Sequence, residues 1–140
     1  MKLNFKTFGA GEPVLILHGL FGSLDNWQTL GKKLAETHLV YLVDLRNHGK
    51  SPHSDSFSYL EMAADILELI EDEKLNSVSI IGHSMGGKTA MTFAVEYPHL
   101  LDKLIVVDIA PKKYAPHHDE IIDALYSLDL KNLKSRTEAD

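Results

Sequence analysis

The chain of 140 residues contains no cysteine. Disulfide bonds, thiolate metal sites and a cysteine nucleophile are therefore excluded. An excess of basic residues is also missing, since 14 Lys and Arg stand against 20 Asp and Glu, a net charge of −6. A protein that neutralises nucleic-acid phosphates needs a basic patch. We therefore expect no nucleic-acid partner.

Long hydrophobic runs are missing as well. The sequence has no continuous apolar stretch of the length that crosses a bilayer, roughly 20 residues. The first residues, MKLNFKTF, alternate apolar with polar side chains and lack the apolar core of a signal peptide. We therefore predict a cytoplasmic protein without membrane insertion.

What is present is an alternation of strand-like and helix-like patterns. Short apolar runs alternate with stretches of helical period, and turn residues separate them. Because strands separated by helices form βαβ units, the fold class should be α/β, with a mostly parallel sheet and helices on both faces. The pattern predicts an edge strand at 3–8 and buried strands at 13–17, 39–45, 78–81 and 104–109.

A helix is predicted to begin after Ser58, which forms a capping box with Glu61. The residues expected to face the sheet follow at helical spacing: Leu60, Ala63, Ala64, Leu67 and Ile70. The acidic residues between them are expected to lie in water: Asp65, Glu68 and Asp72. A later helix is expected over 89–96.

Residues 82–89, GHSMGGKT, satisfy two motifs of different chemistry. Around Ser84 they read G-x-S-x-G, a nucleophile elbow, which holds its serine at positive φ and needs small neighbours. Taken whole they read G-x-x-x-x-G-K-[ST], a phosphate-binding loop, in which Lys88 and Thr89 face a nucleotide and Asp108 binds magnesium. Both motifs require a strand before and a helix after. The motif alone leaves both interpretations open.

Two other loops favour the serine interpretation. HGLFG at 18–22 follows the first buried strand, where a hydrolase needs a backbone N–H for its oxyanion hole. DLRNHGKS at 44–51 follows the second buried strand, and we expect Arg46 and Asn47 to pin this loop to the oxyanion loop. A nucleotide hydrolase needs neither loop.

Together these motifs resemble the α/β-hydrolase superfamily. G-x-G-x-P with HGLFGS, then DLRNHGKS, GHSMGG and DIAP are most similar to the small esterases and acyl thioesterases of the abhydrolase-domain-11 type and its bacterial relatives. The resemblance covers about residues 8–116. It implies a cofactor-free enzyme, a serine hydrolase that cleaves a small carboxylic ester or acyl thioester.

The candidate site residues follow from these motifs. Ser84 is the predicted nucleophile, and a serine that only caps the helix is the alternative. The backbone N–H groups of Met85 and Leu20 are the predicted oxyanion hole, with Phe21 in place of Leu20 if the loop is shifted. Asp108 is the predicted acid that orients a catalytic histidine. Phe21 and Trp27 are candidates for lining the acyl pocket.

The catalytic base is the one part that the pattern does not supply. The order in this fold is Ser, acid, His, so the histidine is expected beyond residue 140. His83 precedes the nucleophile and should point away from it, while His117 and His118 open a helix. We therefore expect residues 1–111 to be the N-terminal part of a hydrolase core and 112–140 the beginning of a helical cap. Such a truncated chain should be inactive alone.

Two alternatives from other classes stay open at this point. One is the nucleotide hydrolase that uses GHSMGGKT. The other is a hydrolase-fold protein that binds a ligand without catalysis, because no catalytic histidine is assigned. The sequence predicts neither the acyl chain length nor the oligomeric state.

Overall fold

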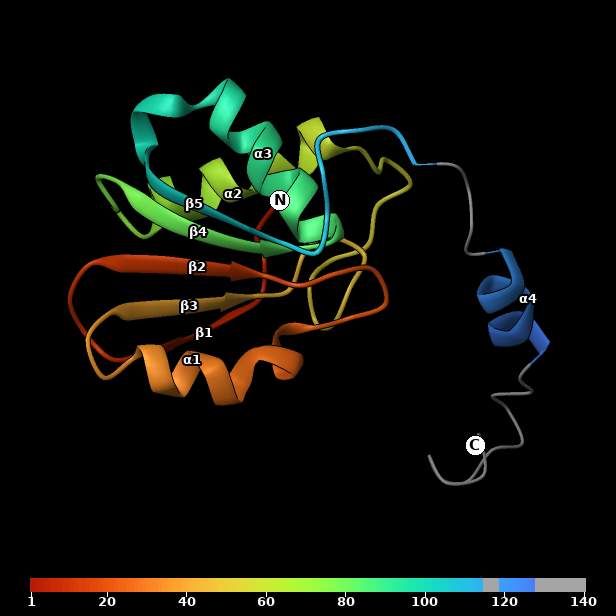
Figure 1. Ribbon diagram of the computed structural model, residues 1–140, viewed down its shortest axis with the longest axis horizontal. Coiled ribbons are helices and arrows are strands. Elements are labelled where there is room, and N and C mark those ends of the chain that lie inside the picture. Colours follow the sequence, from red (N-terminus) through yellow and green to blue (C-terminus); the bar gives the residue numbers. More distant parts are fainter. Residues whose placement is uncertain (115–118, 128–140) are drawn as a thin grey trace.

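The computed structural model describes residues 1–114 and 119–127. In this part of the chain, five strands form one sheet in the order β1-β3-β2-β4-β5 (Figure 1). They are β1 (Phe5–Phe8), β2 (Pro13–Leu17), β3 (Leu39–Val43), β4 (Val78–His83) and β5 (Leu101–Val107). Only β1 is antiparallel to its neighbour among these strands. The predicted α/β class with a mostly parallel sheet is confirmed.

Helices cover both faces of this sheet. The described helices are η1 (Leu24–Trp27), α1 (Gln28–Leu34), α2 (Tyr59–Asp72), α3 (Met85–Glu96), η2 (Pro98–Leu100) and α4 (Asp119–Ser127). Figure 1 shows α1 on one side of the strands and α2 with α3 on the other. The helix expected over 89–96 begins earlier, at Met85, directly after Ser84.

The core divides into two layers because side chains of a strand alternate between the faces of the sheet. Leu15 and Leu17 of β2 belong to the layer under α2 and α3, which includes Ile66 and Phe93. Val14 and Ile16 belong to the layer on the α1 side. This continuous apolar character on both faces is what a buried parallel strand requires.

The predicted buried strand at 104–109 corresponds to β5, and the expectation that it is buried is wrong. It begins at Leu101 and ends at Val107, and Ile105 is 51% exposed. The physical reason is that β5 pairs with β4 alone among the described strands and therefore forms an edge.

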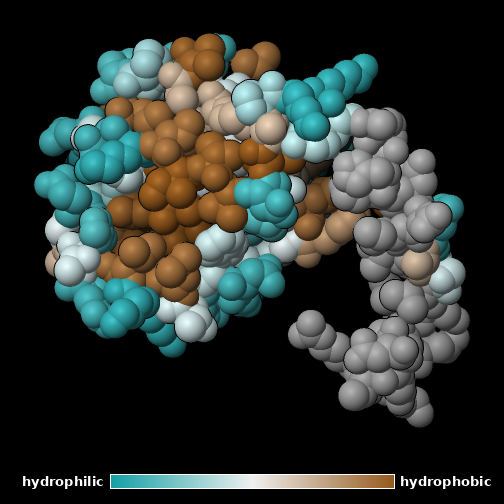
Figure 2. Space-filling view, viewed as in Figure 1, coloured by the Kyte–Doolittle hydropathy of each residue, from teal (hydrophilic) through white to brown (hydrophobic). Residues whose placement is uncertain are grey.

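Figure 2 shows apolar residues gathered over the strands on the viewed face.

The buried face of α2 also differs from its prediction. Ser58 does cap the helix, and its hydroxyl accepts the N–H of Glu61. Leu60, however, is 60% exposed, and Asp65, expected in water, is only 2% exposed. The buried residues of α2 are Met62, Ala63, Asp65, Ile66, Leu69 and Ile70. The helix is thus rotated so that Asp65 reaches an ion-pair partner, Arg46.

The helices of the described residues were compared with the length and composition of a membrane-spanning helix. Across residues 1–114 and 119–127, none of the helices combines the length and the apolar composition that crossing a bilayer requires.

Candidate active site

Ser84 lies in the tight turn between β4 and α3, with φ 50° and ψ −113°. A non-glycine residue at positive φ costs about 1–3 kcal/mol and persists only where its surroundings hold it. Here the Ser84 N–H donates to the Val107 carbonyl at 3.0 Å, and its carbonyl accepts the Lys88 N–H at 3.1 Å. The conformation is that expected of a nucleophile elbow.

The glycines around Ser84 allow three backbone segments to meet. A Cβ on Gly82 would lie 2.4 Å from the Gly86 carbonyl oxygen. A Cβ on Gly86 would lie 2.4 Å from the carbonyl oxygen of Leu17, at the end of β2. Real Cβ atoms do not approach backbone so closely, so no larger residue fits without moving these segments.

The Ser84 side chain does not act as a helix cap. It makes no capping hydrogen bond to α3, although it occupies the N-cap position. Its surroundings leave it half-buried. The alternative role, a serine that only caps the helix, therefore has no support in the contacts.

The oxyanion loop, residues 18–22, packs directly against this elbow. The Gly22 N–H donates to the Gly19 carbonyl at 3.0 Å and closes the loop, while the Gly86 N–H donates to the His18 carbonyl at 3.1 Å. A Cβ on Gly19 would lie 3.3 Å from the Ser84 Cβ. Met85 is the first residue of α3, so its N–H has no acceptor within the helix.

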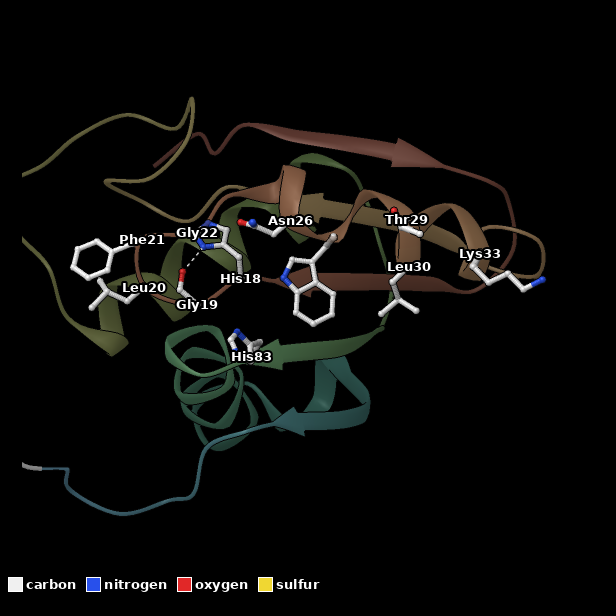
Figure 3. A pocket seen from close by; sticks show the side chains of 11 residues that line it. His18, Gly19, Leu20, Phe21, Gly22, Asn26, Thr29, Leu30, Lys33 and His83 are labelled. Atoms are coloured by element: carbon white, nitrogen blue, oxygen red, sulfur yellow. Dashed lines mark hydrogen bonds between the residues drawn. The ribbon is translucent and has the colours of Figure 1, made fainter. Parts of the chain in front are cut away.

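His18 ties the oxyanion loop to the segment that follows β3. Its Nε2 accepts the Leu45 N–H at 3.0 Å, so its Nδ1 carries the proton and donates to the Gly19 carbonyl at 2.8 Å (Figure 3). The side chain is 1% exposed, and this burial lowers the pKa of His18. Both ring nitrogens are thus used in a neutral, structural imidazole.

Asp44 ties the 44–51 loop to the elements around it. Its carboxylate accepts the backbone N–H of Leu24 at 2.7 Å and that of Lys50 at 2.9 Å. It also accepts the side-chain amide of Asn4 at 2.7 Å. A Cβ on Gly49 would lie 2.2 Å from the Asp44 Cγ, which explains the glycine in this loop.

Arg46 and Asn47 do not pin their loop to the oxyanion loop, and that expectation is corrected. Arg46 donates to both carboxylate oxygens of Asp65 in α2, at 2.6 and 2.9 Å. Asn47 instead holds its own loop together, since its side-chain oxygen accepts the Ser54 N–H at 2.7 Å. The 44–51 loop is linked to the oxyanion loop by the Leu45 N–H, which donates to His18 Nε2.

Asp108 follows β5, next to the end of β4 that leads to Ser84. In the register of the two strands His83 stands opposite Val107, so Asp108 and Ser84 leave the sheet side by side. Asp108 has φ 54° and a side chain that is 88% exposed. Its Oδ2 lies 4.0 Å from His83 Nε2, which is too long for a hydrogen bond.

A cleft of about 840 Å³ opens beside the oxyanion loop (Figure 3). It is lined by His18, Gly19, Leu20, Phe21, Gly22, Asn26, Trp27, Thr29, Leu30, Lys33 and His83. Phe21 and Trp27, the two residues predicted to line a pocket, thus share one cleft with Leu20. The ring centres of Trp27 and His83 are 6.0 Å apart, so His83 turns its ring toward this cleft.

The phosphate-binding interpretation of GHSMGGKT has no support in the side chains. Thr89 is fully buried, and its hydroxyl donates to the Met85 carbonyl at 3.1 Å. The Lys88 Nζ donates to the Lys112 carbonyl at 2.8 Å instead of facing the loop. Neither side chain is placed to hold a nucleotide phosphate or its magnesium.

A metal site also has no candidate among the residues that the structure describes, where no three His, Asp or Glu side chains gather as ligands would. His117 and His118 lie outside the described residues.

Residues 12–138 match the protein family described as alpha/beta hydrolase fold. The chain belongs to this α/β-hydrolase family. The resemblance drawn from its motifs is therefore confirmed at the level of the family.

Among curated relatives, esterase YbfF of Escherichia coli K12 is 37% identical over 145 residues, which cover 99% of this chain and 57% of the relative. The sn-1-specific diacylglycerol lipase ABHD11 of Xenopus laevis is 44% identical over 108 residues, 76% of this chain and 35% of the relative. The chain thus spans between about a third and three fifths of these relatives.

A solved structure described as a marine microorganism esterase superimposes with a TM-score of 0.95 at 50% identity, over 99% of this chain and 56% of that one. Its name agrees with those of the curated relatives. The relatives reported for this α/β-hydrolase chain are thus named as esterases and a lipase.

Proposed function

We propose that this chain carries the nucleophile, the oxyanion hole and the acid of a serine hydrolase that cleaves a small carboxylic ester or an acyl thioester. The observation that supports this proposal most strongly is the strained turn at Ser84, which has φ 50° and lies beside the oxyanion loop. Strain of this kind places a side chain at the carboxyl edge of the sheet, where hydrolases react with substrate.

In the proposed reaction the Ser84 Oγ attacks the acyl carbon and its proton passes to a histidine base. The carbonyl oxygen becomes an oxyanion that the backbone N–H groups of Met85 and Leu20 stabilise, with the N–H of Phe21 as the alternative to Leu20. One such donor stabilises the transition state by about 3 kcal/mol. The alcohol or thiol then leaves with the proton, and water releases the acyl group from Ser84.

Asp108 is the proposed acid of the triad. It would accept the Nδ1–H of the catalytic histidine and hold the ring in the tautomer that takes a proton from Ser84. Its exposed carboxylate beside the end of β4 supports this role, because an acid already paired inside the protein would be unavailable.

The base is proposed to come from outside the described residues. His18 is excluded because both its ring nitrogens bond within the protein, and His48 Nδ1 contacts the Arg46 carbonyl at 2.9 Å. His83 turns toward Trp27 and lies 4.0 Å from Asp108. His117 and His118 open a predicted helix, and no predicted strand end fixes them as a base. We therefore also propose that a polypeptide of residues 1–140 hydrolyses no ester through Ser84.

Ester turnover by the full-length protein tests the proposed function. Short-chain p-nitrophenyl esters and short-chain acyl-CoA thioesters are offered to the native protein, to Ser84→Ala and to Ser77→Ala as a matched serine control. We expect turnover that Ser84→Ala abolishes and Ser77→Ala preserves. Magnesium-dependent ATP binding that Lys88→Ala abolishes would overturn the proposal in favour of a nucleotide hydrolase. Absence of turnover would favour the binding protein.

A further inference from the structure

Lys88 carries a positive charge in the GHSMGGKT turn, and the proposed reaction gives this charge no role. It lies in the first turn of α3 and its backbone N–H donates to the Ser84 carbonyl. Its Nζ donates to the Lys112 carbonyl at 2.8 Å and lies 4.9 Å from the ring centre of Tyr114. A second ring, that of Tyr59, is 5.8 Å away. A cation over aromatic faces is attracted to both rings.

The segment that Lys88 holds is the one that continues from Asp108. The Ala110 N–H donates to the Tyr114 hydroxyl at 3.1 Å, so the segment turns back upon itself. The Cγ2 of Ile109 would lie only 2.6 Å from a Cβ on Gly87, which shows how closely this segment approaches α3. Residues 109–114 are thus fastened to the same helix that begins after Ser84.

Asp108 needs such support because its own backbone is unfavourable. It has φ 54°, and a non-glycine residue keeps a positive φ only where neighbouring contacts maintain it. Its side chain is 88% exposed, so side-chain packing does not fix it. The contacts that hold its direction are therefore those of the backbone on either side.

We propose that Lys88, acting with Tyr114, is a positioning residue that fixes the loop carrying Asp108 relative to Ser84. The inference rests on the proposed function, in which Asp108 orients the catalytic histidine. The contacts of Lys88 join α3, whose first residue is the proposed oxyanion donor Met85, to the segment that follows Asp108. Lys88 thus joins two parts of the catalytic machinery that belong to different strand ends.

The test compares Lys88→Met with Lys113→Met in the full-length protein, using p-nitrophenyl ester turnover. Lys113 is exposed and lies in the same segment, so its replacement removes the same charge. We expect Lys88→Met to lower kcat about tenfold while KM changes less than about twofold, because orientation of the acid matters in the transition state and not for binding. Lys113→Met should leave both constants unchanged.

Rescue separates positioning from a general loss of structure. Lys88→Arg keeps a cation over the Tyr114 ring and a donor for the Lys112 carbonyl, so it should recover most of kcat. Tyr114→Phe keeps the ring but removes the hydroxyl that Ala110 uses, and we expect about a threefold loss of kcat. Unchanged kcat in both Lys88→Met and Tyr114→Phe would overturn the inference.

A double variant distinguishes this inference from the function on which it rests. In an Asp108→Asn background, Lys88→Met should cause no further loss, since residues that act through one another are not additive. A full additional loss would overturn the inference while leaving Asp108 as the acid. If Asp108→Asn itself left kcat unchanged, the acid assigned in the proposed function would be wrong.

Discussion

The buried ion pair between Arg46 and Asp65 gives the strongest prediction about stability. Arg46 donates to both carboxylate oxygens of Asp65, at 2.6 and 2.9 Å, and to the Ser56 carbonyl at 2.9 Å. The two side chains are 9% and 3% exposed. Arg46→Met therefore keeps much of the packing, but it removes two hydrogen bonds and a positive charge from the buried Asp65 carboxylate.

Removal of one partner from a buried pair costs about 3–5 kcal/mol of unfolding free energy. The amino group of Met1 remains 2.9 Å from Asp65, so we expect the lower end, about 3 kcal/mol. The matched control is Lys33→Met, which breaks a pair whose side chains are 74% and 62% exposed. Such an exposed pair contributes about 0.5 kcal/mol or less.

Urea unfolding followed by circular dichroism measures both variants in the full-length protein. The double variant Arg46→Met with Asp65→Leu should recover most of the loss, because no charge is then buried alone. A loss of unfolding free energy in Arg46→Met no larger than that in Lys33→Met would contradict the prediction, as would a double variant as unstable as Arg46→Met.

Three further predictions concern the site. Ser84→Gly should abolish ester turnover yet raise the unfolding free energy by about 1 kcal/mol, because glycine adopts φ 50° without strain; a less stable variant by urea unfolding would contradict this. Burial lowers the pKa of His18 in the folded state, so below about pH 6.5 the unfolded chain binds more protons and stability falls. Urea unfolding at pH 7 and pH 5 should show this loss, and His18→Asn should reduce the difference. Gly86→Ala should lower kcat about 100-fold, because its Cβ would meet the Leu17 carbonyl oxygen at 2.4 Å and displace the elbow; native turnover would contradict it.

Local patterns predicted much of the fold because their causes are local. The bounds of β2, Pro13–Leu17, were predictable since turn residues flank a short apolar run on both sides. The start of α2 was predictable since Ser58 caps it. The turn at Ser84 was predictable since the small residues that a positive φ requires adjoin it in sequence.

Features that depend on distant partners were not predictable in this way. Asp65 was expected in water, because its partner Arg46 stands 19 positions earlier and belongs to a different element. The bond from the Leu45 N–H to His18 Nε2 joins the residue after β2 to the segment that follows β3, which no single segment reveals. Lys88 suggested a phosphate ligand, because its true contacts, Lys112 and Tyr114, come together only once β5 lies beside β4.

Covalent labelling identifies the nucleophile without a substrate. The full-length protein is treated with a fluorophosphonate, digested, and its labelled peptide sequenced by mass spectrometry. We expect a single adduct on Ser84, which neither heat-unfolded protein nor Ser84→Ala should form. An adduct on any other residue, or undiminished labelling of Ser84→Ala, would contradict it.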